Sequence, residues 1–169
     1  MFEAYLEVLG KGYYEAKLAF EGLADENVWK RPADGLLSVG ELAGHVAYWV
    51  AARLSGEGME PEADVTKWRV SSLLIDHRFA YYPETVAIPP ADVHLAMTAE
   101  QVCSELLRVH SESVASFKKL NPNLDSCPPK WPSGYTYRAF LTYAAFHVAY
   151  HTGQMYSVRH LLGDVTPDN

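Results

Sequence analysis

The stretch FHVAYHTGQM, residues 146–155, decides both the fold and the site predicted for this sequence. His147 and His151 are four positions apart, so an α-helix places them one turn apart on the same face. The residues between them are largely apolar and compatible with a helix. Two imidazoles at this spacing can bind one metal ion, but a metal site needs at least one more ligand. A third ligand must therefore come from elsewhere in the chain.

The stretch belongs to a long amphipathic helix predicted from Thr136, a suitable N-cap, to about Leu162, where Gly163 stops it. Apolar residues recur at helical spacing along one side of this helix, and both histidines fall among them. This predicted inward stripe is Phe140, Ala144, His147, His151, Met155 or Gln154, Val158 and Leu162. The two imidazoles are therefore expected on the buried side of the helix.

A second helix is predicted over residues 39–54, because Ser38 and Glu41 form a capping box before an apolar pattern. His45 lies three residues after Leu42 and four before Trp49, and this spacing directs it toward the core. His45 is thus the candidate third ligand.

Two further helices complete the pattern, over residues 2–23 and 98–120, the latter behind a second capping box at Thr98 and Gln101. Residues 24–37 are interpreted as a loop. The proline-rich segment 56–97 is interpreted as a crossover that packs over one end of the core, with a short helix over about 65–75. Four long helices predict an all-α four-helix bundle in one domain, residues 1–169, with a long crossover between the second and third helices.

The composition restricts the function classes. The chain is 49% hydrophobic and 21% charged, as soluble globular proteins are. A formal net charge of -7 without a basic cluster argues against a nucleic-acid partner. No stretch approaches the roughly 18 apolar residues of a membrane-spanning helix, and we expect a cytoplasmic protein without a membrane partner. Cys103 and Cys127 do not make a disulfide framework.

Two interpretations of the histidines are open: either each imidazole is hydrogen-bonded in the core, or the three together bind a metal. A zinc-protease motif is absent, because no Glu follows His147. His110, on the third helix, is expected at the surface or rim. Trp49, Tyr143 and Tyr150 are expected in the core or in the wall of a pocket.

The sequence resembles the DinB/YfiT-like family of metal-dependent proteins. The resemblance rests on His45 within SVGELAGH, on the HxxxHxGQ pattern from His147 to Gln154, and on Trp29 and Pro32 before the second helix. It implies a bundle with up-down-down-up connectivity, a divalent metal held by His45, His147 and His151, and often a homodimer. It also implies that Gly153 permits a close approach of helices and that Gln154 supports a ligand from behind or packs between helices.

Characterised members of that family include transferases and isomerases that use low-molecular-weight thiols. We therefore expect a metal-dependent thiol transferase acting on a small electrophile, with zinc or nickel as the metal. The alternatives are a metal-dependent hydrolase and a non-catalytic, metal-stabilised dimeric bundle in stress response. An open pocket at the metal would favour an enzyme. The candidate pocket residues are Trp49, Phe79, Tyr81 and Tyr82.

Overall fold

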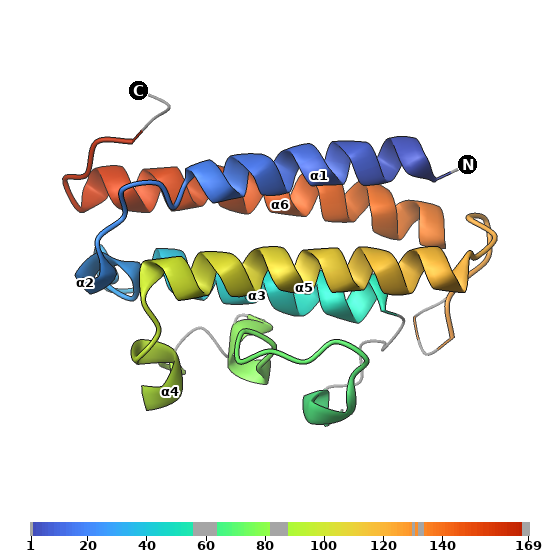
Figure 1. Ribbon diagram of the computed structural model, residues 1–169, viewed down its shortest axis with the longest axis horizontal. Helices are drawn as coiled ribbons and strands as arrows, with labels where there is room; N and C mark the ends of the chain where they lie inside the picture. Colours follow the sequence, from blue (N-terminus) through green and yellow to red (C-terminus); the bar gives the residue numbers. More distant parts are fainter. Residues whose placement is uncertain (1, 56–63, 82–87, 130, 132–133, 167–169) are drawn as a thin grey trace.

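Four long helices form the body of the protein in the computed structural model (Figure 1). The structure describes residues 2–55, 64–81, 88–129, 131 and 134–166, and these contain no strand, so the all-α prediction is confirmed. The long helices are α1 (Glu3–Leu18), α3 (Val39–Leu54), α5 (Ala99–Leu120) and α6 (Tyr137–Leu161). The short ones are α2 (Asp25–Val28), η1 (Val65–Lys67), η2 (His77–Phe79) and α4 (Asp92–Leu95).

The long helices pack in two layers. Helix α1 lies on α6, and α3 contacts both α5 and α6. Figure 1 shows α1 and α6 above α3 and α5, with α3 and α5 running in the same direction and α1 and α6 in the opposite one. The long connection between α3 and α5 permits this parallel arrangement, because it returns the chain along the length of the bundle. Within the described residues, no helix combines the length and apolar character needed to cross a bilayer.

The helix starts are fixed by the predicted caps. Ser38 Oγ accepts a hydrogen bond from the backbone N–H of Glu41 at 3.2 Å, and Glu41 Oε2 accepts one from the Ser38 N–H at 2.8 Å. Thr98 and Gln101 form the same reciprocal pair at the start of α5. Each pair satisfies backbone donors that a helix N-terminus leaves without partners.

The crossover differs from the expectation. Its described parts lie along the outer side of the α3–α5 layer in Figure 1, and η2 packs on α3, so the prediction that it covers one end of the core is wrong. The helix expected over 65–75 is limited to the single 3₁₀ turn η1. Helix α2 formed where a loop was expected.

Candidate metal centre

Helices α3 and α6 bring the three predicted histidines together. One ligand atom from each of His45, His147 and His151 lies within 4.8 Å of the other two, which is close enough for all three to hold one metal ion. The Nε2 atoms of His45 and His147 are 3.0 Å apart, and the ring of His151 is centred 4.4 Å from that of His147. The first two histidines are buried and the third is partly exposed.

The crossover orients His45. Its Nδ1 lies 2.8 Å from the backbone oxygen of Phe79. Because a carbonyl oxygen only accepts, Nδ1 carries the proton and donates, and Nε2 is left with a lone pair facing the other histidines. One turn later, Trp49 Nε1 donates to the backbone oxygen of Ala80 at 2.9 Å. These two hydrogen bonds hold the crossover against α3 beside the three histidines.

A glycine makes this attachment possible. The ring of Phe79 lies directly on the backbone of α3 at Gly44, where a Cβ atom would come within 2.6 Å of the ring. Any larger residue at position 44 would push the ring outward and move the Phe79 carbonyl away from His45. Gly44 therefore positions His45 indirectly, by leaving room for the Phe79 ring.

Gln154 lies behind His151. The Nδ1 of His151 is 2.6 Å from Gln154 Oε1, and because that oxygen accepts, Nε2 of His151 is left for the cluster. The Gln154 amide also donates to the Tyr150 hydroxyl at 3.4 Å. Gly153 is exposed, and a Cβ atom built there meets no atom of the described chain within 4 Å, so this glycine does not mediate a close approach between described helices.

Burial keeps the imidazoles neutral. Desolvation lowers the pKa of His45 to about 3 and that of His147 to about 2, and it also lowers the pKa of His151. Since Nε2 of His45 carries no proton, Nε2 of His147 must donate across the 3.0 Å contact. A divalent metal would be held by the lone pairs of both Nε2 atoms in place of this hydrogen bond, with the proton of His147 moved to its Nδ1. Three neutral imidazoles are a donor set that suits zinc and nickel, so the residues fit the implied metal.

The cluster opens into a cavity of about 630 Å³, bounded by α3, α6, the crossover and the segment before α6. Trp49 and Tyr81 line it as predicted. Phe79 does not: its side chain is fully buried, and it contributes its carbonyl to His45 instead. Tyr82 lies outside the described residues. The lining is His45, Trp49, Arg53, Ala80, Tyr81, Trp131, Tyr135, Ala139, Phe140, Tyr143, Phe146, His147, Tyr150 and His151.

Arg53 was not predicted as a site residue. Its guanidinium carbon lies 4.7 Å from the ring centre of Trp49 and 4.7 Å from that of Tyr143. Helical spacing carries the signal that could have found it, because Arg53 follows His45 by eight positions and so shares its face of α3. Tyr143 precedes His147 by four positions and likewise shares its face of α6.

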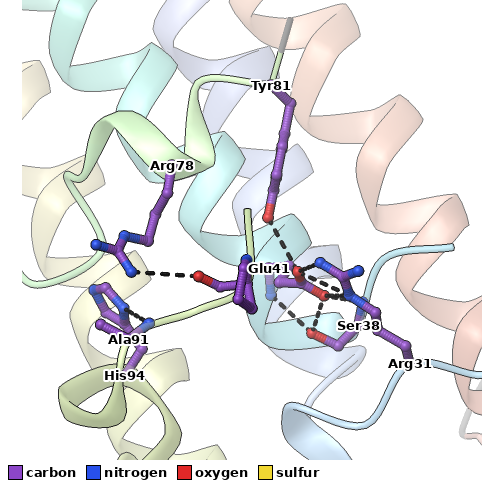
Figure 2. A network of polar contacts seen from close by, with 8 residues as sticks. Arg31, Ser38, Glu41, Arg78, Tyr81, Ala91 and His94 are labelled. Carbon is purple, nitrogen blue, oxygen red and sulfur yellow. Dashed lines mark hydrogen bonds and ion pairs between the residues drawn. The ribbon is translucent and has the colours of Figure 1, made fainter. Parts of the chain in front are cut away.

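Tyr81 connects the cavity to the ion pair that the buried Glu41 makes with the partly exposed Arg31. Its ring is centred 5.5 Å from that of His45, and its hydroxyl donates to Glu41 Oε1 at 3.4 Å. Figure 2 shows this hydroxyl directed at Glu41, where Arg31 and Ser38 also meet. Burial raises the pKa of Tyr81, so the hydroxyl stays protonated and donates. Tyr81 holds a left-handed backbone conformation, with φ of 39°.

A comparison with protein families identifies the superfamily of the chain. The sequence pattern of the DinB superfamily matches residues 13–155, a range that includes all three histidines. The chain belongs to the DinB superfamily. The resemblance drawn from the histidine motif is thereby confirmed for this DinB protein. No curated protein and no solved structure matches the chain.

Proposed function

We propose that this DinB protein binds a divalent metal through His45, His147 and His151 and transfers a low-molecular-weight thiol to a small electrophile. The observation that carries the proposal is the cluster of three neutral imidazoles opening into an aromatic cavity. Three protein ligands leave a position for a substrate atom, as in catalytic metal sites. A site serving only to stabilise the bundle would instead be closed by protein groups.

Some residues of the site orient the histidines, and others line the cavity and limit the access of water. The Phe79 carbonyl and Gln154 fix the orientation of His45 and His151. A divalent metal, when bound, supplies the positive charge that lowers the pKa of a bound thiol. The aromatic walls, including Trp49 and Tyr81, limit the access of water and hold the electrophile beside the thiol sulfur.

The lining favours thiol transfer over hydrolysis. None of the described residues that line the cavity is an aspartate or a glutamate, and the histidines among them are the candidate ligands. Attack by water needs a base to take its proton, whereas an ionised thiol has already lost its proton. A metal-dependent hydrolase is therefore the second candidate.

A screen of thiol co-substrates tests the proposal. Metal-loaded protein is mixed with a small aryl halide and one low-molecular-weight thiol, with a different thiol in each reaction. Thioether formation is measured. We expect turnover that requires both metal and thiol and that His45→Ala abolishes. His160→Ala, at an exposed histidine of α6, is the matched control and should retain activity. Hydrolysis of the substrate without any thiol would favour the hydrolase instead.

We also propose that the chain forms a homodimer through α6. One stripe of this helix is exposed along its length and is not covered by any described element: Phe146, Tyr150, Gly153, Ser157 and Leu161. These positions recur at helical spacing, and Gly153 at the centre would let a second helix approach closely. A partner helix on this stripe would bury apolar side chains that are otherwise in water.

A further inference from the structure

We infer that the cavity selects a substrate in which an aromatic or apolar body carries an anionic group, a carboxylate in the first instance, and that Arg53 binds that group. The inference rests on the proposed function, because it assigns the substrate class of the same site. Four observations support it: the charge of the lining, the position of the guanidinium, the buried indole N–H of Trp131, and the exposed aromatic rings beside the cluster.

The lining has one sign of charge. Arg53 is the only arginine, lysine, aspartate or glutamate among the described residues that line the cavity; the others are histidines and apolar or aromatic residues. A divalent metal would add to this positive charge. A largely apolar cavity with a net positive lining favours an anionic ligand over a cationic one.

The guanidinium is held in a defined place. Arg53 lies against the rings of Trp49 and Tyr143, at 4.7 Å from each ring centre, which is within the range of a cation–π contact. Contacts of this kind use the faces of the planar guanidinium, whereas pairing with a carboxylate uses its N–H edge. That edge carries five N–H donors, and one of them, on Nη1, donates to the backbone oxygen of Trp49 at 3.5 Å. The two modes are therefore compatible in one arginine.

Arg53 also lies near the metal ligands. The ring of Tyr143 contacts the Arg53 guanidinium and stacks against the imidazole of His147, with ring centres 5.6 Å apart. The ring of Tyr143 thus contacts both the Arg53 guanidinium and the imidazole of His147. A small molecule can therefore reach both of them, with its reacting atom at the cluster and its anionic group at Arg53.

A second donor is available for a ligand oxygen. Trp131 lines the cavity and is 8% exposed, and its indole nitrogen is buried without a hydrogen-bond partner in the described part of the chain. A buried N–H without an acceptor is unfavourable. A carboxylate or carbonyl oxygen is the kind of acceptor that this donor lacks.

Exposed rings define the apolar part of the ligand. Tyr135 and Tyr143 are 51% and 48% exposed, and both line the cavity. The ring of Tyr135 also lies near that of Trp131, with ring centres 6.3 Å apart. Aromatic surface of this kind beside a ligand cluster is suited to stacking on the body of a substrate.

Matched thiol probes test the inference by binding. The probes are 3-(mercaptomethyl)benzoate and its uncharged amide, 3-(mercaptomethyl)benzamide, titrated calorimetrically into zinc-loaded protein. We expect the acid to bind about tenfold more tightly than the amide, as a charge-assisted contact predicts. Arg53→Gln should abolish this preference and Arg53→Lys should keep part of it. Arg138→Gln, at an exposed arginine of α6 outside this cavity, is the control and should keep all of it.

A second arm identifies which reactant carries the anionic group. The enzyme transfers an uncharged thiol to 4-(chloromethyl)benzoate or to 4-(chloromethyl)benzamide; in each case the thiolate sulfur forms a bond to the methylene carbon and chloride leaves. The pairing is then reversed, with the acidic thiol and the amide electrophile. A larger loss of kcat/KM in Arg53→Gln with one acidic partner assigns the anionic group to that partner.

The outcomes separate the inference from the proposed function. The inference is overturned, while the metal site stands, if the wild type binds the acid and the amide equally. It is also overturned if Arg53→Gln keeps the preference for the acid, or if neither thiol binds the zinc-loaded protein. Failure of the wild type to bind zinc would overturn the proposed function and the inference with it. Metal content is measured for every variant, so that a loss of metal is distinguished from a loss of selectivity.

Discussion

Gly44 is the single residue on which the orientation of His45 most depends. A Cβ atom at this position would lie 2.6 Å from the Phe79 ring, so Gly44→Ala must displace that ring and with it the carbonyl that holds His45. We predict that metal affinity falls about tenfold or more, the usual cost of losing a partner that orients a ligand. Metal titration of the folded variant measures this.

Gly10 provides the matched control. It lies within α1, and a Cβ atom there meets nothing within 4 Å. Gly10→Ala should leave metal affinity unchanged and stabilise the protein by up to about 1 kcal/mol through helix propensity. Wild-type metal affinity in Gly44→Ala would contradict the role given to the Phe79 carbonyl.

His110, which was expected at the surface or rim, is partly buried and lies between α5 and α1. Its ring stacks on that of the buried Tyr13 at 3.8 Å, and its Nδ1 is buried without a partner in the described chain. Desolvation lowers its pKa to about 4. The pattern of α5 did not reveal this, because burial of one edge of a helix depends on which neighbour covers it.

The lowered pKa of His110 has a consequence for stability. Between pH 6.5 and 4 the unfolded chain binds a proton at this residue and the folded chain does not. The free energy of unfolding therefore falls as pH decreases through this range, by up to about 1.4 kcal/mol per pH unit from this residue. His110→Phe keeps the ring and removes the titration, so its unfolding free energy should fall less between pH 7 and 5. Urea unfolding of metal-free protein checks this, and equal falls in both proteins would contradict it.

At the scale of elements, Arg159 ties the end of α6 to the end of α1. Its side chain is 1% exposed, donates to the backbone oxygens of Ala19 and Glu21, and pairs with Asp164. Arg159→Met leaves these acceptors without partners, and we predict a loss of about 3 kcal/mol in the free energy of unfolding.

An exposed ion pair serves as the comparison for Arg159. Arg138 pairs with Asp125 at the other end of α6, and both side chains are largely accessible to solvent. Arg138→Gln should cost at most about 1 kcal/mol in the same denaturant titration. Similar losses in the two variants would show that burial does not decide the contribution of these arginines.

The long helices were predictable because their signals are local. A capping box such as Ser38 with Glu41 fixes a start, and a glycine such as Gly163 fixes an end, whatever packs against the helix. The crossover was not predictable, because distant contacts determine it. His94, for example, accepts from the Ala91 N–H and donates to the Leu73 oxygen, while Phe79 depends on Gly44. Such contacts cannot be predicted from the periodicity of apolar residues in the sequence.

At the scale of the whole molecule, the ligand cluster was predictable and the cavity was not. His45, His147 and His151 each belong to an apolar stripe, so helical spacing alone directs them inward. Trp131 becomes a site residue only when α3, α6 and the segment before α6 are assembled around the cavity.

The proposed homodimer gives a prediction at this scale. Gly153→Arg adds a large cation where nothing in the described chain lies within 4 Å, so the fold should be preserved while a partner helix is excluded. We expect the wild type to sediment as a dimer and the variant as a monomer with unchanged helicity and metal content. A wild-type monomer, or a dimer that persists in the variant, would contradict the α6 interface.

The most direct test of the central claim is the metal content of protein purified without an affinity tag, which avoids loading by a histidine tag. Elemental analysis and a zinc titration are compared for the wild type, His147→Ala and the control His160→Ala. We predict one divalent ion per chain in the wild type and the control, with binding weakened by at least about a hundredfold in His147→Ala. A wild type that binds no divalent metal, or a His147→Ala variant that binds zinc as tightly as the wild type, would contradict the claim.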